Sequence, residues 1–375
     1  MNNNCDHIKV LIQIRDLRIG NGIAACIMNY YEYTIQNGIS IDFLLNRDLD
    51  SPYRNIVLKN GSRLFTMPHD TSKPNKDNVA YIKKIISSGY DILHVNTSGY
   101  YALCALRIAK RNGIKARIYH AHNPKEPFSL KVAVRNKLYV EPCKRYANQF
   151  AACSTEAGNS IFKGKRFTVI HNAMDTTRYQ FDARKREVLR SELNIDDKFV
   201  IGVVARFENQ KNPFFLIDVF TEFRKICPDA VLIWVGEGSL RDQIQERIAE
   251  KGVNDSVKLL GTRKDANELY SAMDMFLLPS KYEGLGLVFV EAQISGLQCF
   301  GSDQVPKDVE ITKNMKRLSL NKDSTYWAEE MKKNRATEID RRNVGLQLRK
   351  SDFEISNGWD ALQKMYRAYL LQEKN

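Results

Sequence analysis

The stretch Phe276-Leu-Leu-Pro-Ser-Lys-Tyr-Glu-Gly-Leu-Gly-Leu-Val-Phe-Val-Glu-Ala-Gln-Ile-Ser-Gly-Leu297 is the most informative part of the sequence. Its apolar start predicts a buried strand, its glycines a tight loop, and the run after them a helix. A helix that begins in a glycine loop exposes unpaired N–H groups and the positive end of its dipole, which suits a phosphate. Glu283 in the loop and Glu291, about two turns into the helix, could then accept hydrogen bonds from hydroxyl groups on either side of that phosphate.

The order of strand, loop and helix repeats along the whole chain. We predict strands at 8–14, 39–45, 92–95, 116–120 and 149–152, and a second series at 199–204, 230–235, 257–260, 275–278 and 299–302. Helices are expected at 23–36, 78–87 and 102–111, and an amphipathic helix at 356–371. Short apolar strands that alternate with longer helices are typical of parallel α/β layers.

The domain organisation follows from length and from one break in this rhythm. A chain of 375 residues is long enough for two cores. The polar stretch 172–197 looks like an irregular linker between the two strand series. We therefore expect an N-terminal domain at 1–172, a second domain at 173–355, and a C-terminal helix in 356–375 that crosses back to the first.

Composition indicates a cytoplasmic protein. Hydrophobic residues make up 43% and charged residues 27% of the chain, and no stretch approaches the roughly 20 apolar residues of a spanning helix. The N-terminal residues run directly into a strand, without a visible signal peptide. The seven cysteines stand singly, which suits a reducing compartment.

The net charge of +13 is confined to the first half of the chain. Residues 1–172 contain 25 Lys and Arg against 12 Asp and Glu, whereas the remainder contains 32 of each. Such asymmetry points to an anionic partner for the first half, either membrane lipid or nucleic acid. No basic-aromatic nucleic-acid module is recognisable, so we expect no nucleic acid.

The basic charge is densest from Lys125 to Arg145. Lys131, Arg135, Lys137 and Lys144 alternate there with apolar residues. On a helix this pattern makes a basic amphipathic surface that can lie on an anionic membrane. An ordinary surface helix with a solvated face explains the pattern equally well.

The first glycine loop, Gly20-Asn-Gly-Ile-Ala-Ala25, matches the dinucleotide fingerprint, and Asp42 follows it at a suitable distance. However, five residues separate the preceding strand from Gly20, and Asp42 lies early in its own strand. A backbone loop that faces a phosphate or sugar is therefore favoured over a nicotinamide site, and a simple tight turn remains the alternative.

Three histidines occur where predicted strands end: His94, His120 and His122. Open α/β sheets bind ligands at the carboxyl ends of their strands, so these imidazoles could face a ligand. Buried structural histidines are the commoner case, and His-x-His as a metal pair lacks neighbouring carboxylate or cysteine partners.

Two further strand ends carry polar residues. Arg206 and Lys211 follow one strand and could clamp a diphosphate. Gly236 and Gly238 follow the next, where we expect them to let the backbone approach a ligand. Each loop alone reads as an ordinary surface loop; together with Glu283 and Glu291 they form a set that suits one nucleotide.

These residues resemble the retaining glycosyltransferases of family 4. The most specific match is the Glu-x7-Glu motif from Glu283 to Glu291. Supporting matches are Val169-Ile-His-Asn-Ala-Met-Asp175, Arg206 with Lys211, and Val235-Gly-Glu-Gly238. The segments Ala121-His-Asn and Ala152-Cys-Ser are most similar to the sequences of enzymes that build bacterial capsules and exopolysaccharides. The resemblance covers 8–372 and implies the GT-B fold, two Rossmann-like domains facing a central cleft.

The resemblance also implies roles for individual residues. Arg206 and Lys211 would bind the diphosphate and stabilise the leaving group, and Glu291 would bind the ribose. His122, or less plausibly His120, would lie beside the sugar. The remaining expected donor contacts are Gly20, Gly22, Gly236, Glu237, Glu283, Gly284, Leu285, Gly286 and Leu287.

The implied reaction is transfer of a hexosyl unit with retention of configuration, without a metal or other cofactor. The donor would be a UDP-sugar rather than a GDP-sugar, and the acceptor a saccharide on an undecaprenyl lipid at the inner face of the membrane. The sequence departs from the family where Asn21 separates the first-loop glycines, and at Ala173 and Val288. A sugar-nucleotide epimerase or a phosphorylase of the same architecture remains an alternative.

Overall fold

The computed structural model describes residues 8–19, 21–122, 130–335 and 340–371, with the side chains of 130–132 and 369–371 left out. The chain divides into two compact units. The first contains Met1–Met174 and Ile355–Asn375, and the second contains Asp175–Glu354. The two units are described separately below.

The first unit is built on a parallel sheet in the order β3-β2-β1-β4-β5-β6-β7. Its strands are β1 (Ile8–Ile14), β2 (Ile39–Leu45), β3 (Leu64–Thr66), β4 (Ile92–Val95), β5 (Ala116–Ala121), β6 (Gln149–Ala152) and β7 (Thr168–Val169). β1 and β4 are almost continuous apolar runs and are buried on both faces, as parallel strands between helical layers require.

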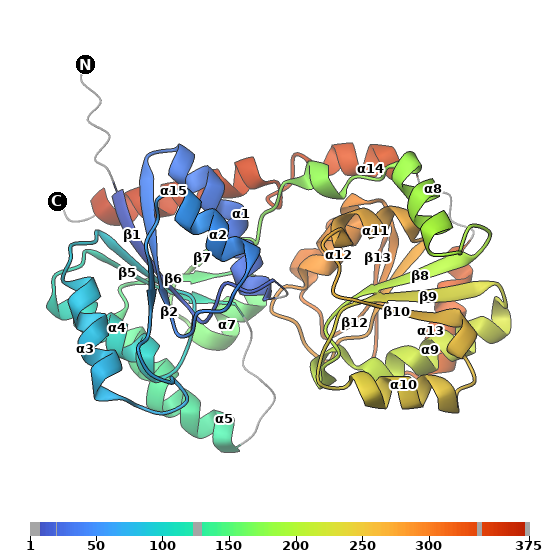
Figure 1. Cartoon of the computed structure of the whole chain (residues 1–375), viewed down its shortest axis with the longest axis horizontal. Coiled ribbons are helices and arrows are strands. Elements are labelled where there is room, and N and C mark those ends of the chain that lie inside the picture. The colour runs from blue at the N-terminus through green and yellow to red at the C-terminus, as the bar shows by residue number, and fades with distance from the viewer. Residues whose placement is uncertain (1–7, 20, 123–129, 336–339, 372–375) are drawn as a thin grey trace. The chain divides into compact units, whose positions relative to one another are not determined.

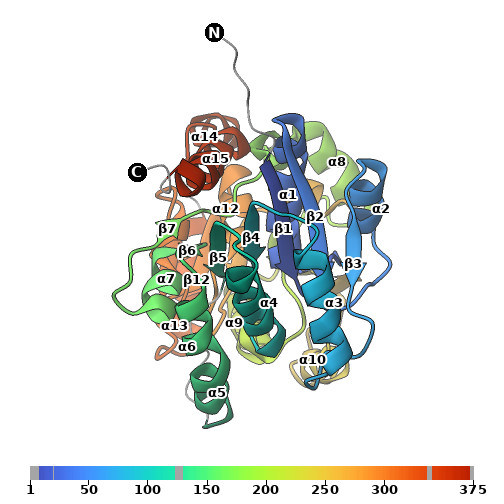
Figure 2. The same ribbon diagram turned by 90° about the vertical axis from the view of Figure 1, so that its left-hand side faces the viewer.

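Helices cover this sheet (Figures 1 and 2). They are α1 (Gly22–Gln36), α2 (Pro52–Lys59), α3 (Lys76–Ile86), α4 (Tyr100–Arg111), α5 (Leu130–Arg135), the π-helical turn η1 (Asn136–Val140), α6 (Glu141–Tyr146), α7 (Thr155–Phe162) and α15 (Ile355–Leu371). α3 packs against α4, and α1 packs against α15. The last helix of the chain thus lies beside the first (Figure 1).

α15 completes the core of the first unit. Its apolar stripe of Trp359, Leu362, Met365 and Tyr366 is buried in the same cluster as the apolar residues of β1, β2 and α1. A Cβ at Gly358 would lie 2.4 Å from Ala173 Cβ, so only glycine allows the helix this close. These contacts place 355–371 with the first unit.

The second unit repeats the architecture with the strand order β10-β9-β8-β11-β12-β13. Its strands are β8 (Phe199–Val204), β9 (Ala230–Val235), β10 (Val257–Gly261), β11 (Met275–Leu278), β12 (Gln298–Ser302) and β13 (Met315–Leu318). The helices are α8 (Ala183–Glu192), α9 (Pro213–Ile226), α10 (Arg241–Glu250), α11 (Ala266–Ala272), α12 (Leu287–Ile294), α13 (Ser324–Arg335) and α14 (Arg341–Leu348), with short 3-10 turns η2 (Thr176–Tyr179), η3 (Asn209–Lys211), η4 (Asn254–Ser256) and η5 (Lys307–Val309).

The expected irregular linker at 172–197 is wrong in part. It contains η2 and the ten-residue helix α8, which packs against α11. The sequence of α8 has no apolar stripe to mark it as a helix, because six of its ten residues are charged. Its anchors to the rest of the unit are Leu189 and the guanidinium groups of Arg186 and Arg190, which bind Asp274 before β11.

Replacing Trp359 by alanine is expected to destabilise the first unit by about 3–5 kcal/mol, because the side chain is buried between α15 and the sheet. Urea unfolding of the full chain measures this change. Lys364→Ala, at an exposed position of the same helix, is the control and should change stability by no more than about 0.5 kcal/mol. Equal stability of the two variants would contradict the packing described for α15.

Candidate active site

The loop between β11 and α12 is anchored by a buried carboxylate. Glu283 is only 5% exposed. Its Oε1 accepts hydrogen bonds from Lys211 Nζ at 2.6 Å and from Ser280 Oγ at 2.6 Å. A buried carboxylate with a cation and a hydroxyl on one oxygen is held in a single orientation. Glu283 and Lys211, 72 positions apart in sequence, are therefore direct partners.

Backbone contacts join the loop after β8 to the loop after β11. Lys281 N donates to Gln210 O at 2.8 Å, and Gln210 Nε2 donates to Tyr282 O at 2.9 Å. Lys281 Nζ also donates to Asn209 Oδ1 at 2.5 Å. Arg206 lies on the first of these loops with half of its side chain exposed, and its Nη1 lies 4.0 Å from Glu208 Oε1.

Helix α12 begins at the glycine loop. Gly286 is its N-cap, with φ +88°, and no side chain caps the helix. A residue with a Cβ is strained in this conformation, and the uncapped N–H groups beyond it suit an anion. Glu291 is the fifth residue of α12, so it lies just past the first turn rather than two turns in.

Glu291 is held by a partner that the sequence did not suggest. Tyr270 Oη on α11 donates to Glu291 Oε2 at 2.6 Å. Burial raises the pKa of Glu291 to about 7, and the hydrogen bond from Tyr270 opposes this shift. The carboxylate is thus close to a change of ionisation near neutral pH, and its second oxygen can accept a hydrogen bond from a ligand hydroxyl.

The glycines after β9 allow two neighbouring loops to pack closely. A Cβ on Gly236 would lie 2.0 Å from Ala205 O, and one on Gly238 would lie 2.4 Å from Phe207 O. Both glycines let this loop pack against the backbone on either side of Arg206, and Phe207 N donates to Glu237 O at 3.1 Å. The close approach is therefore to the neighbouring loop. The Glu237 side chain pairs with Arg241.

The predicted histidines gather at the carboxyl ends of β4 and β5. His122 Nε2 lies 2.8 Å from Asn96 Oδ1, and its ring stacks on His120 with centroids 4.1 Å apart. His120 Nδ1 lies 3.0 Å from His94 Nε2, and His94 Nδ1 lies 2.8 Å from Tyr366 Oη on α15. Burial lowers the pKa of His94 and of His122 to about 3, and that of His120 well below its usual value. All three imidazoles are neutral at pH 7.

The loop after β1 is organised by a buried acid. Gly20 lies outside the described residues, and Gly22 is the first residue of α1. Asn21 caps α1 by accepting from Ile23 N at 3.1 Å, and its Nδ2 donates to Asp16 Oδ1 at 3.1 Å. Asn21, a departure from the family pattern, therefore stabilises the loop.

Asp42 does not serve as a dinucleotide carboxylate. It accepts hydrogen bonds from Arg63 Nη2 at 2.7 Å and from Tyr90 Oη at 2.8 Å. A carboxylate paired in this way to a guanidinium and a phenol is not available for a ribose.

The basic segment is helical where the structure describes it. α5, η1 and α6 follow one another from Leu130 to Tyr146. Arg135 and Lys137 are exposed, as are the apolar Val134 (49%) and Leu138 (54%). The side chain of Lys131 and the segment 123–129 lie outside the described residues. No described helix has the length and apolar character needed to cross a bilayer.

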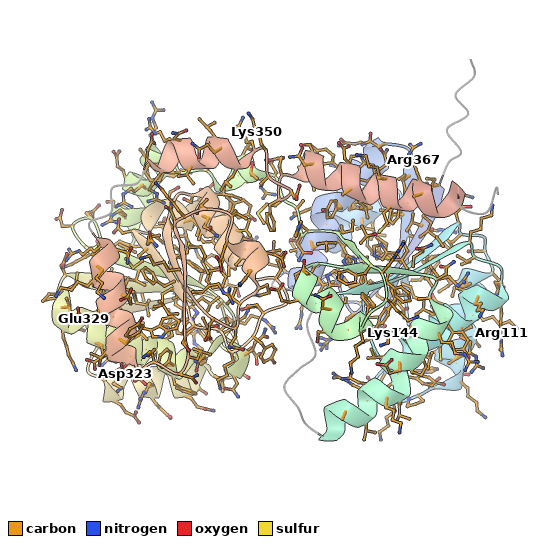
Figure 3. The ribbon with its side chains drawn as sticks, turned by 180° about the vertical axis from the view of Figure 1, so that it is seen from behind. Arg111, Lys144, Asp323, Glu329, Lys350 and Arg367 are labelled. Atoms are coloured by element: carbon orange, nitrogen blue, oxygen red, sulfur yellow. The ribbon has the colours of Figure 1, made fainter. Side chains whose placement is uncertain are left out.

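Lys144 is an exception within this segment. It is buried and pairs with Glu141 at 2.6 Å, so it does not belong to the exposed charge. α4 packs against η1 and α6 and enlarges the basic surface (Figure 3). The exposed cations of this surface are Arg107, Lys110, Arg111, Lys115, Arg135, Lys137 and Arg145.

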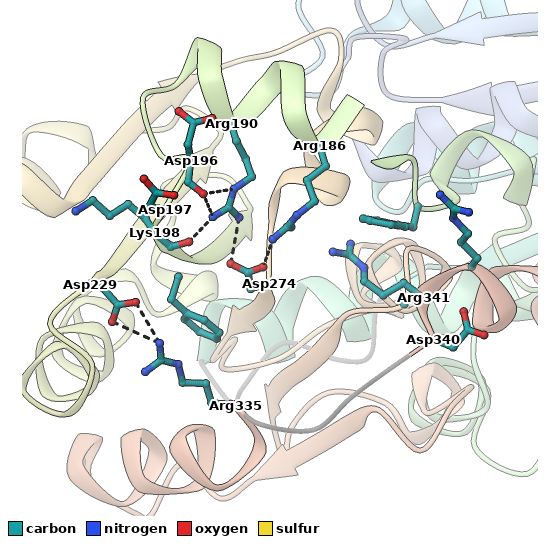
Figure 4. Close-up of a pocket in the computed structure, with 14 residues that line it drawn as sticks. Arg186, Arg190, Asp196, Asp197, Lys198, Asp229, Asp274, Arg335, Asp340 and Arg341 are labelled. Atoms are coloured by element: carbon teal, nitrogen blue, oxygen red, sulfur yellow. Dashed lines mark hydrogen bonds and ion pairs between the residues drawn. The ribbon is translucent and has the colours of Figure 1, made fainter. Parts of the chain in front are cut away.

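A cavity of about 840 Å³ lies at the amino ends of the strands of the second sheet, whereas the loops that follow β8 and β11 lie at their carboxyl ends (Figure 4). Asp274, directly before β11, binds Arg186 and Arg190 there. Arg341 donates to the carbonyl groups of Ser295, Met273 and Tyr270, each at 2.8 Å. These arginines satisfy carbonyls near the ends of α11 and α12. The cavity is therefore a structural feature, separate from the loops that follow β8 and β11.

The chain matches known families over both units. Residues 20–178 match the family model described as Glycosyltransferase Family 4, and residues 185–347 match that of Glycosyl transferases group 1. Together with the loop set around Glu283, these matches show that the chain is a glycosyltransferase of the GT-B class. It resembles the bacterial enzymes of exopolysaccharide synthesis, as predicted.

Individual relatives agree with this assignment. Over 322 residues the chain is 29% identical to EpsF of Bacillus subtilis, which carries a provisional glycosyltransferase name, with 82% of this chain and 83% of EpsF covered. Over 250 residues it is 26% identical to the UDP-Gal:alpha-D-GlcNAc-diphosphoundecaprenol alpha-1,3-galactosyltransferase of Escherichia coli, with 62% of each chain covered.

Solved structures confirm the predicted fold. Anabaena HepE, crystallised with UDP and glucose, has a TM-score of 0.78 at 20% identity, with 96% of this chain and 100% of HepE covered. WaaG, a glycosyltransferase of lipopolysaccharide biosynthesis, has a TM-score of 0.71 at 13% identity, with 97% and 99% covered.

Replacing Gly236 by alanine is expected to displace the Arg206 loop and to destabilise the second unit by about 1–3 kcal/mol, because the added Cβ overlaps Ala205 O. Gly252→Ala is the control, since Gly252 also has positive φ (+65°) but open space around it. Thermal unfolding of both variants measures the difference. If Gly236→Ala costs no more than Gly252→Ala, the close packing of the two loops is wrong.

Proposed function

We propose that this glycosyltransferase moves a hexosyl unit from a UDP-sugar to a saccharide acceptor, with retention of configuration. The observation that carries the proposal is the cluster of Lys211, Glu283 and Ser280 beside the uncapped start of α12, with Glu291 on the same helix. It combines a helix N-terminus that can bind an anion with two carboxylates that can accept hydrogen bonds from hydroxyl groups.

Each part of the donor has a matching group. The diphosphate would lie at the N–H groups that follow Gly286, with Arg206 and Lys211 as cations. The ribose hydroxyls would donate to Glu291, and the sugar hydroxyls to Glu283. The backbone of Gly284, Leu285 and Leu287 would complete the contacts to sugar and phosphate. Glu237 and Gly236 would contribute through the loop that supports Arg206.

The chemistry asked of these residues is mainly electrostatic. The bond from the sugar C1 to the diphosphate oxygen breaks, a new bond forms from C1 to the acceptor oxygen on the same face, and the acceptor proton passes to the leaving diphosphate. Preorganised cations and helix N–H groups stabilise the charge on that leaving group without solvent rearrangement. Because this positive charge comes from the protein, we propose that no divalent metal is needed. Transfer that stops in EDTA would contradict this point.

Similarity supports the choice of substrates. The Escherichia coli relative is named for a UDP-galactose donor and a diphosphoundecaprenol acceptor, and HepE was crystallised with UDP. We therefore favour UDP over GDP, and a lipid-linked acceptor in cell-surface polysaccharide synthesis. An epimerase or phosphorylase would differ in its products, because only a transferase releases UDP in step with consumption of a saccharide acceptor.

Glu291→Ala is expected to weaken UDP binding roughly tenfold, because a buried hydrogen bond between a carboxylate and the ribose is lost. Lys211→Ala should instead lower the turnover number, by about tenfold or more, with a smaller effect on UDP affinity. Calorimetry with UDP and assays of UDP release report the two effects. Lys225→Ala, which removes a surface pair with Glu222, is the control; wild-type behaviour of both site variants would show that the site lies elsewhere.

We further propose that the surface of α4, α5, η1 and α6 docks on the inner face of the cell membrane. Its exposed cations suit anionic lipid, and Val134 and Leu138 supply apolar anchors at helical spacing. The expected membrane residues Arg135 and Lys137 belong to it, and Lys131 lies in the same helix. A peripheral, cytoplasmic enzyme would thereby meet a lipid-linked acceptor.

Binding to vesicles that contain about 30% anionic lipid should fall about thirtyfold when Arg135 and Lys137 are both changed to Gln, since each basic residue near the surface contributes about 1 kcal/mol. Sedimentation at low and moderate salt measures the change. Lys332→Gln together with Lys333→Gln on α13 of the second unit is the control, because both are exposed lysines in ion pairs. Equal loss in both double variants would point to non-specific charge attraction.

A further inference from the structure

The amide of Asn96 fixes which nitrogen of His122 carries the proton. Asn96 Nδ2 donates to His94 O at 3.3 Å, so Oδ1 is the atom that faces His122 Nε2 at 2.8 Å. The opposite amide orientation would bring two oxygens together. A carbonyl oxygen only accepts, so His122 Nε2 must carry hydrogen and Nδ1 must present a lone pair.

Nδ1 of His122 has no hydrogen-bond partner among the described residues. His122 is 8% exposed, and its neutral form is strongly favoured by burial. An unmet buried acceptor costs free energy unless a ligand hydroxyl or a water satisfies it. The group that suits this atom is a donor, such as a sugar hydroxyl.

The same reasoning gives the direction of the hydrogen bonds that link Tyr366, His94 and His120. If Tyr366 Oη donates to His94 Nδ1, then His94 Nε2–H donates to His120 Nδ1, and one buried group, His120 Nε2, lacks a described partner. The reverse polarity would leave the Tyr366 hydroxyl hydrogen unmet as well. The first arrangement has fewer unmet groups and is favoured.

Packing supports a positioning role for this chain of groups. His94 and His120 are stacked at 5.2 Å with an interplanar angle of 7°, and Tyr366 contacts His94 edge-on. Tyr366 is 1% exposed, so its hydroxyl is held by the body of α15. Tyr366 therefore fixes the ring of His94, His94 fixes that of His120, and His120 stacks on that of His122.

We propose that Asn96 and Tyr366 are positioning residues for His122, the residue that the family resemblance places beside the sugar. Asn96 locks His122 in its Nε2–H tautomer, which leaves Nδ1 as an acceptor for a saccharide hydroxyl. Tyr366 holds the rings of His94 and His120, on which His122 stacks. The saccharide contact rests on the proposed function. The tautomer and the positioning roles do not depend on it. His122 then cannot donate a proton or supply positive charge in the reaction.

The tautomers can be observed directly in the full chain labelled with 15N-histidine. Long-range 1H–15N spectra should show His122 and His94 as Nε2–H forms at pH 7. Asn96→Ala should remove the preference of His122 for the Nε2–H tautomer. Asn96→Asp keeps an acceptor oxygen and should retain that preference. An Nδ1–H form of His122 in the wild-type protein, or an unchanged tautomer in Asn96→Ala, would overturn the proposal.

Kinetics provide the second readout. Asn96→Ala and Tyr366→Phe should each lower turnover of UDP-sugar roughly twofold to tenfold, the value of one oriented hydrogen bond, with UDP affinity unchanged. Tyr101→Phe is the matched control, because this change also removes a buried hydroxyl group. The hydroxyl of Tyr101 accepts a hydrogen bond from Asn78 on α3 and donates one to the carbonyl oxygen of Lys73, which precedes α3. Equal loss in Tyr101→Phe would overturn the positioning role of Tyr366. A protein with the expected tautomers but no transfer of sugar would refute the proposed function alone.

Discussion

The ion pair between Lys211 and Glu283 is the interaction on which the proposed donor site depends. It is largely buried, with the side chains 15% and 6% exposed, and it joins the loop after β8 to the loop after β11. Removing one partner of such a pair leaves a buried charge uncompensated, which costs about 3–5 kcal/mol. The pair therefore sets the distance between the cations of one loop and the helix start of the other before any ligand arrives, as preorganised electrostatic stabilisation requires.

Most strands were predictable because the residues that bury a parallel strand form a short apolar run. The bounds expected for β1, β2, β4, β8, β9 and β11 are those observed. The sequence missed β3, β7 and β13, which are short, half-exposed or at sheet edges, and so lack a continuous apolar signal. It missed α8 because ion pairs with Asp274, rather than an apolar stripe, attach that helix.

The contacts of the candidate site residues could not be predicted from the sequence. The sequence pointed to Glu291 and His122 but gave no sign of Tyr270 or Asn96, because a hydrogen-bond partner on another element has no fixed spacing in sequence. It also gave no sign that Gly236 packs against Ala205, since a glycine needed for a ligand and one needed for a neighbouring backbone look alike in sequence. Only the packed structure distinguishes these cases.

The return of α15 to the first unit has a consequence for the order of folding. The chain must complete residues 175–354 before it can add 355–371 to the core of the first unit. On the ribosome, the apolar residues of α1 and β1 that share a core cluster with Trp359 and Met365 therefore emerge well before that cluster can be completed. The second unit consists of one continuous segment, so it can complete its core before α15 is available to the first unit.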